Sequence, residues 1–369
     1  MMRTIIGMTM GDPAGIGSEL CVKVLSREDV YQRCKPLVVG DARCIQDAIG
    51  FTGIDTLDVH PVSHPSEGEY VCGTIDVLDL KNVNMDELAY GKVSAMCGKA
   101  CGEYISRAIE LALVGELDAT VTCPIHKESF KLGGYGEKYP GHTEMFADLT
   151  GTEKYSMMLA HGNLRTVHVT THVSLRQACD LVKKERVLDV IEIAYHACRA
   201  LGIEEPKIGV AGLNPHAGDG KIFGTEETEE IIPAIQKAQS RGYTVDGPVP
   251  ADTLYSKVKG GWYDIAVSMY HDQGHIPLKL AGFVWNEENG QWTSVAGVNV
   301  TLGLPIIRVS VDHGTAFGKA GKGRANETSL VNAIDYAVRF AGNKSRTRVK
   351  TPIQILSKKP ITQKGAPIR

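Results

Sequence analysis

Short apolar runs alternate with segments of helical periodicity along nearly the whole chain, and this alternation limits the possible folds more than any other feature. Strands that are separated by helices pair in parallel, because a crossover helix returns the chain to the same end of the sheet. We therefore predict an α/β fold with a largely parallel sheet. The expected strands cover residues 5–10, 37–41, 119–124, 164–171, 207–213, 264–270 and 306–311.

Length and charge narrow the class of protein. With 369 residues the chain can hold two cores, since single cores stop growing near roughly 250–300 residues. A net charge of −3, with no basic face and no membrane-length apolar run, predicts neither a nucleic-acid nor a membrane partner. Nine cysteines without a Cys-x-x-Cys pair, and no recognisable signal peptide, predict reduced thiols in a cytoplasmic protein.

Three histidines, His172, His216 and His271, each stand just past the end of a predicted strand. Ligands of open α/β sheets bind at the carboxyl ends of the strands, and neutral imidazoles are common ligands of divalent metals. The chain also uses histidine elsewhere, so each of the three could instead be a hydrogen-bonded structural group. From their placement alone both interpretations stay open.

Local patterns predict several further elements. Residues 91–115 have helical periodicity with small residues on one face, which suits close packing. Residues 174–200 are expected to form one long helix that begins with a capping box. Polar residues 271–275 are expected to form a turn. The Asn-Gly pair at 289–290 predicts a hairpin with Trp285 and Trp292 on its two arms.

Two glycine-rich or polar loops leave alternatives open. Residues 11–19 follow the first strand and permit a tight turn into a helix, whose N-terminus could receive a phosphate. Leu20 stands where a Rossmann fingerprint requires its third glycine, so that motif is absent. In the loop before Glu144, Thr143 could cap the helix or bind a ligand.

Seven motifs resemble those of the PdxA family, whose namesake is 4-hydroxythreonine-4-phosphate dehydrogenase of vitamin B6 biosynthesis. They occur in family order from the first strand to about residue 340. The motifs are residues 10–17 (MGDPAGIG), 140–144 (PGHTE), 170–172 (TTH), 214–218 (NPHAG), 270–274 (YHDQG), 297–299 (GVN) and 312–316 (DHGTA).

The resemblance implies a two-lobed α/β/α fold of the isocitrate and isopropylmalate dehydrogenase type. Its cofactor-side lobe would combine residues 1–121 and 262–345, and residues 122–261 would form the substrate and dimer lobe. Residues 346–369 would form a mobile basic tail. The family also implies a homodimer with shared active sites.

The resemblance further implies roles for individual residues. His172, His216 and His271 would bind one divalent metal, zinc or else magnesium, manganese or cobalt. Substrate contacts would be His142, Thr143, Lys279, Asn299 and Arg308, with Lys279, Asp252 and Asp272 as catalytic or metal-orienting groups. NAD would be bound by Gly11, Asp12, Gly15, Gly17, His313, Gly314, Thr315, Ala316 and Asn326.

The implied activity is NAD-linked oxidative decarboxylation of a 4-phosphorylated 3-hydroxy acid. Residues 274–279, 173–176 and 222–226 are more similar to the catabolic branch, whose members oxidise D-threonate or D-erythronate 4-phosphate. The segment from Phe283 to Gly297 is longer than the family pattern, and its hairpin is expected to border the substrate cleft or only a surface. A non-catalytic three-histidine metal protein and a metal-dependent hydrolase are the competing functions.

Overall fold

The computed structural model describes residues 3–287 and 291–343, and their strands form one 12-stranded sheet with a separate two-stranded hairpin. The order in the large sheet is β3-β4-β2-β1-β5-β14-β13-β6-β7-β10-β8-β9. These strands are β1 (Thr4–Thr9), β2 (Cys34–Gly40), β3 (Asp58–Val62), β4 (Thr74–Asp79), β5 (Ala119–Thr122), β6 (Ser156–His161), β7 (Leu164–His168), β8 (Lys207–Ala211), β9 (Thr244–Val249), β10 (Ile265–Ser268), β13 (Val298–Leu302) and β14 (Arg308–Val311).

Antiparallel pairing in the middle of the sheet joins two groups of parallel strands. Strands β3, β4, β2, β1, β5 and β14 are mutually parallel, and so are β7, β10, β8 and β9. Between them β13 pairs antiparallel with both β14 and β6, and β6 pairs antiparallel with β7. In this register Val298 lies between Val311 and Ala160. The predicted parallel α/β sheet is therefore confirmed, with an antiparallel centre that the apolar runs did not reveal.

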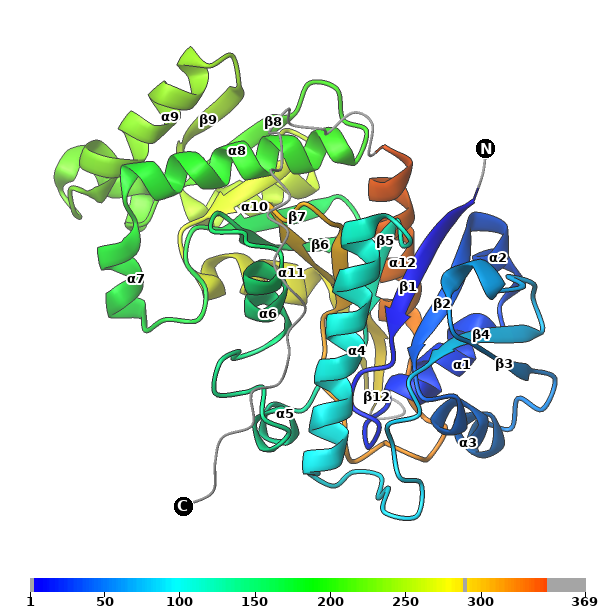
Figure 1. Cartoon of the computed structure of the whole chain (residues 1–369). Coiled ribbons are helices and arrows are strands. Elements are labelled where there is room, and N and C mark those ends of the chain that lie inside the picture. Colours follow the sequence, from blue (N-terminus) through cyan, green and yellow to red (C-terminus); the bar gives the residue numbers. More distant parts are fainter. Residues whose placement is uncertain (1–2, 288–290, 344–369) are drawn as a thin grey trace.

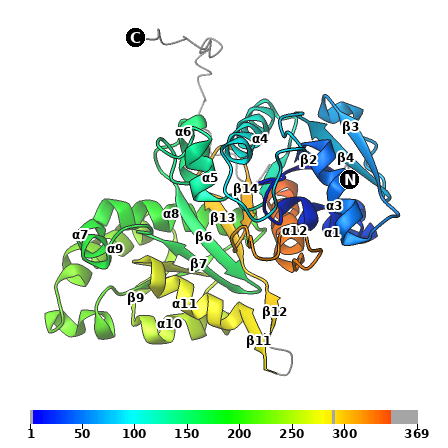
Figure 2. The ribbon, with the colours of Figure 1, turned by 90° about the horizontal axis from the view of Figure 1, so that it is seen from below.

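Helices cover both faces of the sheet (Figures 1 and 2). On one half α4 packs on β1, β2 and β5, and α12 packs on the opposite face of β1, β5 and β14. On the other half α8 covers one face, and α10 and α11 cover the other. The helices are α1 (Gly17–Leu25), α2 (Glu28–Arg33), α3 (Ala42–Thr52), α4 (Ala95–Val114), α5 (Lys127–Leu132), α6 (His142–Leu149), α7 (Leu175–Leu181), α8 (Lys184–Ala200), α9 (Ile232–Ser240), α10 (Ala251–Lys259), α11 (His271–Gly282) and α12 (Thr328–Gly342), with short helical turns η1 (Pro65–Glu67), η2 (Pro215–Lys221) and η3 (Glu227–Ile231).

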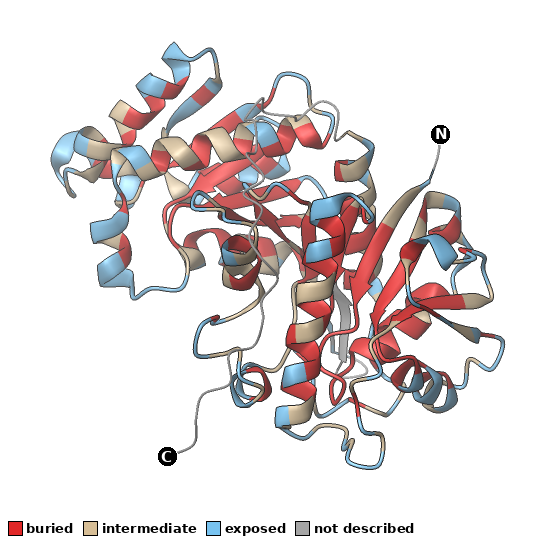
Figure 3. Ribbon diagram, viewed as in Figure 1, coloured by how far each residue is buried: buried red, intermediate tan, exposed pale blue. Residues whose placement is uncertain are grey.

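Burial follows this layering, since the central strands are almost wholly buried, the edge strands β3 and β9 are partly exposed, and each helix is buried along the side that meets the sheet (Figure 3). The small face predicted for residues 91–115 has its physical reason here. A Cβ on Gly98 would stand 1.7 Å from the carbonyl oxygen of Ser129, so only glycine lets α4 lie against the start of α5. Within the described ranges no helix is both long and apolar enough to cross a membrane.

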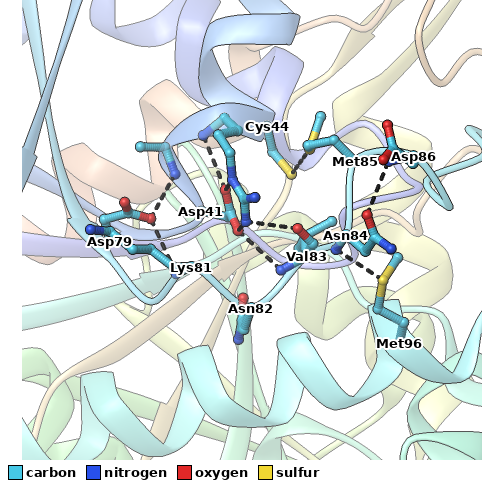
Figure 4. Close-up of polar contacts among 12 residues, drawn as sticks. Asp41, Cys44, Asp79, Lys81, Asn82, Val83, Asn84, Met85, Asp86 and Met96 are labelled. Atoms are coloured by element: carbon cyan, nitrogen blue, oxygen red, sulfur yellow. Dashed lines mark hydrogen bonds and ion pairs between the residues drawn. The ribbon is translucent and has the colours of Figure 1, made fainter.

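The region from 52 to 90 contains β3 and β4 and a polar junction with α3 (Figure 4). Buried Asp41 caps α3 by accepting from the amide of Arg43, and it also accepts from the amide of Val83 at 3.0 Å. Asp79 likewise accepts from the amides of Ala42 and Lys81. These carboxylates tie the irregular segment after β4 to the first turn of α3 (Figure 4).

Two local predictions are wrong, and one of the two alternatives left open for Thr143 is excluded. Residues 174–200 form two helices, because buried Val182 leaves helical geometry and the amide of Lys184 bonds Glu230 at 2.8 Å, which starts α8 anew. Residues 271–275 are the first turn of α11, where the Gln273 side chain accepts from the Met269 amide. Thr143 does not cap α6, whose N-cap is Gly141.

The predicted hairpin is present as β11 (Phe283–Asn286) and β12 (Gln291–Val295), with Trp285 paired to Trp292 in the antiparallel register. It follows directly on α11 and leads into β13. Residues 346–369, the expected mobile tail, lie outside the described residues. The proposed division into two lobes stays a prediction.

Candidate active site

A buried arginine marks the centre of the sheet. Arg308 begins β14 and is only 4% exposed, yet its hydrogen-bond partners in the described structure are hydroxyls, Thr301 on β13 at 3.0 Å and Thr122 on β5 at 2.9 Å, and its guanidinium lies over the Phe146 ring. Its Nε atom is buried without a hydrogen-bond partner. Burial lowers the pKa of the Arg308 guanidinium to about 10, although Glu144 favours the charged form. A buried cation held by neutral groups is a site prepared for an anion.

Predicted substrate residues surround this arginine. His142, the first residue of α6, has a buried Nε2 without a partner, and its pKa is held well below the usual value by burial and by Arg308. The Thr143 hydroxyl lies 3.5 Å from that of Thr301. Asn299 on β13 donates to the Met157 sulfur while its Oδ1 is buried and unpartnered. The structure therefore brings His142, Thr143 and Arg308 together around unsatisfied polar atoms, and we call this group the anion pocket.

The three histidines follow three neighbouring strands, as the sequence predicted. Strands β7, β10 and β8 are adjacent and parallel, so His172, His271 and His216 all leave the same edge of the sheet. The rings of His172 and His271 have centroids 5.9 Å apart. Two imidazoles on one tetrahedral zinc would be roughly 5 Å apart, given Zn–N distances of about 2 Å. The observed separation is about 1 Å longer than that expected for two imidazoles on one zinc.

The donor chemistry of this cluster also suits a divalent metal. Burial lowers the pKa of His172, so its imidazole is neutral as a metal ligand must be. Asp272 Oδ1 lies 2.7 Å from His271 Nδ1, which leaves Nε2 for a metal and matches the orienting role expected of Asp272. Among residues 3–287 and 291–343, however, no three His, Cys, Asp or Glu side chains converge on one point.

His216 is the member that stands apart. It lies on η2, where residues 216–221 all have positive φ, and its ring is 6.2 Å from Phe223. The segment is anchored by Glu227, a buried carboxylate that accepts from the amides of Leu213 and Asn214 and from the Asn214 side chain. Four non-glycine residues here cost roughly 1–2 kcal/mol each in a left-handed conformation. The conformation therefore depends on the Glu227 anchor.

Two acidic residues connect the anion pocket with the histidines. Glu144 on α6 raises the pKa of both Arg308 and His172 by its charge, although burial lowers both more strongly. Asp312, just past β14, lies 3.7 Å from Lys279 Nζ, and burial raises its pKa while Lys279 and His271 lower it. A hollow of about 630 Å³ adjoins His172, lined by residues that include Glu144 and Arg186.

The two loops expected to bind a cofactor lie against one another. Ile16 donates from its amide to the Thr315 carbonyl at 3.3 Å, and Gly15 faces the Thr315 side chain. A Cβ on Gly17 would stand 1.9 Å from the Met10 carbonyl oxygen, so this tight turn into α1 requires glycine. Buried His313 Nε2 has no partner, and the space around Gly314 is open. An unsatisfied donor or acceptor beside open backbone fits a nucleotide.

The other predicted residues have plainer surroundings. Asn326 Oδ1 accepts from the Thr328 amide and so starts α12. Asp12 accepts from the Ala14 amide within its own turn. Ala316 has φ +43 in the loop, while Asp252 is exposed in the first turn of α10.

Sequence reasoning assigned no role to several residues that the structure places here. Nothing in the sequence distinguished Thr122 and Thr301 from other residues around them. Their role becomes visible only when the strands pair and their hydroxyls contact Arg308. Glu144 and Asp312 belong to the motifs at 140–144 and 312–316, so their place in the sequence could have identified them as site residues. His168 and His275 form a second pair of rings behind His271, and burial lowers their pKa values to about 4 and about 3.

The chain is similar to a known family and to several of its members. The family model of the pyridoxal phosphate biosynthetic protein PdxA matches residues 32–337. A Clostridium botulinum protein with the provisional name D-threonate 4-phosphate dehydrogenase is 45% identical over 339 residues, covering 92% of this chain and 97% of its own.

Two solved structures are similar over the whole fold. A 4-hydroxythreonine-4-phosphate dehydrogenase from Burkholderia phymatum is 44% identical with a TM-score of 0.79, covering 92% of this chain and 99% of its own. The enzyme of that name from Klebsiella pneumoniae is 40% identical with a TM-score of 0.80, covering 92% and 98%.

Proposed function

The chain belongs to the PdxA family, and from this premise we propose that it catalyses the NAD-linked, metal-dependent oxidative decarboxylation of a 4-phosphorylated 3-hydroxy acid. The observation that carries the proposal is Arg308, a buried guanidinium whose partners in the described structure are hydroxyls. Such a cation is costly to bury unless an anion completes its shell. A phosphate group on the substrate supplies that anion.

The anion pocket has the donors that a phosphate needs. The Arg308 Nε and His142 Nε2 atoms are unsatisfied, and the Thr143 and Thr301 hydroxyls lie beside them. Binding energy from this remote group holds the reacting carbon in place, and orientation of this kind can lower a barrier by several kcal/mol. The Asn299 Oδ1 atom, buried and without a partner among the described residues, would accept a hydrogen bond from a further hydroxyl group of the substrate.

The histidines would hold the metal. His172 and His271 would share one ion, and His216 would complete the set. Zinc or a similar divalent cation bound there would act as a Lewis acid that lowers the pKa of the substrate hydroxyl. Asp272, in contact with His271 Nδ1, would contribute to the orientation of that ring. Lys279, which lies 3.7 Å from Asp312, would take or relay the hydroxyl proton.

The chemistry then follows from the substrate. NAD bound by the loops at residues 11–17 and 312–326 would accept the hydride. Oxidation of a 3-hydroxy acid gives a 3-keto acid, whose carboxylate departs as carbon dioxide because the carbonyl accepts the remaining electron pair. Lys279 can return a proton to the product. Asp252 is exposed, and its position does not favour proton transfer over an orienting role.

The site would be completed by a second copy of the chain. His216 lies apart from His172, and apolar side chains beside both of them are exposed, namely Ile222 and Phe223 on one segment and Val173 and Leu175 on the other. Exposed apolar groups next to an incomplete site indicate a surface that a partner covers. A homodimer with shared active sites satisfies both observations.

The competing functions are not favoured. A three-histidine metal protein without catalysis would not require a buried arginine. A metal-dependent hydrolase would not require the two contacting loops at residues 11–17 and 312–326. Relatives named for D-threonate 4-phosphate and for 4-hydroxythreonine 4-phosphate are nearly equally similar, at 45% and 44% identity. Sequence identity therefore does not choose between a catabolic and a biosynthetic substrate.

The hairpin β11–β12 would border the substrate cleft, because it joins α11, which carries Lys279, to β13, which carries Asn299.

The test uses the purified protein with NAD, a divalent metal and a panel of acids. The panel holds the 4-phosphates of D-threonate, D-erythronate and 4-hydroxythreonine. We expect NADH with at least one of them, and one carbon dioxide released for each NADH. NADH without carbon dioxide would exclude the decarboxylating step, and no reduced nicotinamide from any member, with either NAD or NADP, would overturn the proposed function.

A further inference from the structure

A second histidine is stacked on one of the proposed metal ligands. His275 follows His271 by one helical turn on α11 and is only 7% exposed. The two imidazole rings have centroids 3.5 Å apart and planes inclined by 13°. His275 Nδ1 lies 2.8 Å from the carbonyl oxygen of His271. A carbonyl only accepts, so Nδ1 carries the proton, and this bond fixes both the tautomer and the plane of the His275 ring.

The His275 ring is supported in turn by buried neighbours. The ring of His168, on β7, is 4.8 Å from that of His275 and wholly buried, and its Nδ1 bonds the Met157 carbonyl at 3.1 Å. Gly274 permits this contact. A Cβ there would stand 2.5 Å from His168 Nε2 and 2.8 Å from the Ser268 hydroxyl, so a larger residue would push α11 away from the sheet.

His271 has little else to fix its ring. It is the first residue of α11, and the centroids of the His172 and His168 rings are 5.9 and 6.4 Å from its own. Its Nδ1 contacts Asp272, whose side chain is 69% exposed. Water competes for a hydrogen bond at such an exposed carboxylate, so that contact orients the ring weakly. The buried side of the His271 ring is its face against His275. The His275 ring is therefore the firmer of the two constraints.

We propose that His275 is a positioning residue of the metal site, whose stacked ring holds the His271 imidazole so that Nε2 faces the metal. This rests on the proposed function, because it assumes that His271 is a metal ligand. His275 touches neither metal nor substrate in this account and acts through His271 alone. Partners of metal-binding histidines that fix ring orientation affect metal affinity by about 10–100-fold.

The test measures Co²⁺ binding to the metal-free, full-length protein by competition with a chelator and by visible absorption. His275→Leu and His275→Gln both remove the flat ring, and His275→Phe restores it without the Nδ1 bond. We expect the first two to weaken Co²⁺ binding by roughly 10–100-fold and to change the spectrum, and His275→Phe to recover part of the affinity. His196→Leu on α8 is the matched control and should leave both unchanged.

Thermal unfolding of each metal-free variant shows which of them are folded. Wild-type affinity and spectrum in a folded Leu or Gln variant would overturn the proposal, and so would a folded Phe variant as weak as the Leu variant. Failure of the proposed function looks different. In that case the wild-type protein itself binds no Co²⁺, or binds it equally well after His271→Ala.

Discussion

The anion pocket and the histidine cluster are built by different means. Arg308 projects from a strand and is held by hydroxyls from the two flanking strands, so the pairing of β5, β14 and β13 places its guanidinium. The histidines stand in the loops or the helical turn that follow their strands, and only His172 and His271 are close together. A site on paired strands is complete within one chain. A site on three separate loops needs a ligand or a second chain to bring its members together.

The cluster's dependence on loops has an energetic side. The left-handed segment at 216–221 is stable only while Glu227 accepts three hydrogen bonds from residues 213 and 214. No comparable strain surrounds Arg308, whose cost is desolvation. The histidine cluster is therefore sensitive to backbone changes, and the anion pocket is sensitive to changes of charge. The predictions below separate these two kinds of sensitivity.

Loss of a metal ligand is expected to have the largest effect. Changing His172, His216 or His271 singly to Ala should remove most bound metal and lower kcat/KM by about 10³-fold or more, because Lewis-acid stabilisation is worth several kcal/mol. Metal content by elemental analysis and initial rates check this. His196→Ala should change neither quantity, and stoichiometric metal in all three variants would exclude these ligands.

Mixing two inactive variants tests whether the histidine cluster is shared. His172→Ala and His216→Ala proteins, mixed and allowed to exchange subunits, should regain roughly a quarter of wild-type activity if the ligands come from different chains, since about half the dimers are mixed and each has one intact site. No recovery despite demonstrated exchange would place both histidines in the same site of one chain.

Arg308→Lys should have the next largest effect. An ammonium group cannot bond Thr122, Thr301 and a phosphate together as a guanidinium does, so kcat/KM should fall by roughly 100-fold, or about 2.7 kcal/mol. Bound metal should stay at the wild-type level, which distinguishes the pocket from the cluster. Arg339→Lys, on α12 beside Tyr336, is the control. A normal kcat/KM in the Arg308→Lys variant would exclude Arg308 as the group that binds the phosphate.

Acid should destabilise the metal-free protein through buried histidines. Burial lowers the pKa values of His168 and His275 to about 4 and about 3, below the ordinary value of about 6.5. Between about pH 6.5 and 4 the unfolded chain binds more protons, so stability falls as pH falls, by up to roughly 1.4 kcal/mol per pH unit for each group.

Urea unfolding near pH 7 and near pH 5 measures this loss. His168→Leu should lower stability at neutral pH but reduce its dependence on pH, while His64→Gln, at a partly exposed position, should keep the wild-type dependence. Equal dependence in all three proteins would show that the buried histidines do not carry the acid sensitivity.

The sequence predicted the parts of this molecule that depend on periodicity and on strand ends. All seven expected strands are present, and the three histidines do follow neighbouring strands. Local patterns could not show the break at Val182, because it is caused by Glu230, a residue 48 positions away in the chain. They also could not show that polar residues 271–275 are helical, since that turn is fixed by Gln273 binding across to β10 and to Gly212 after β8.

The same limit applies to the site. The resemblance supplied Arg308 and His142, but not the Thr122 and Thr301 hydroxyls that hold the guanidinium, because those contacts exist only once the strands are paired. His271 and His275 are four residues apart in the sequence, but residues with this spacing contact one another only when they lie on a helix. Expecting a turn at 271–275 therefore concealed their contact.

The central claim is that Arg308 binds the phosphate of the substrate, and the most direct measurement combines a change of substrate with a change of protein. kcat/KM is measured for the active four-carbon acid with and without its phosphate, in the wild type and in Arg308→Ala. We predict that removing the phosphate costs the wild type orders of magnitude in kcat/KM and costs the variant far less, because the variant has already lost that contact. An equal cost in both proteins would contradict the account.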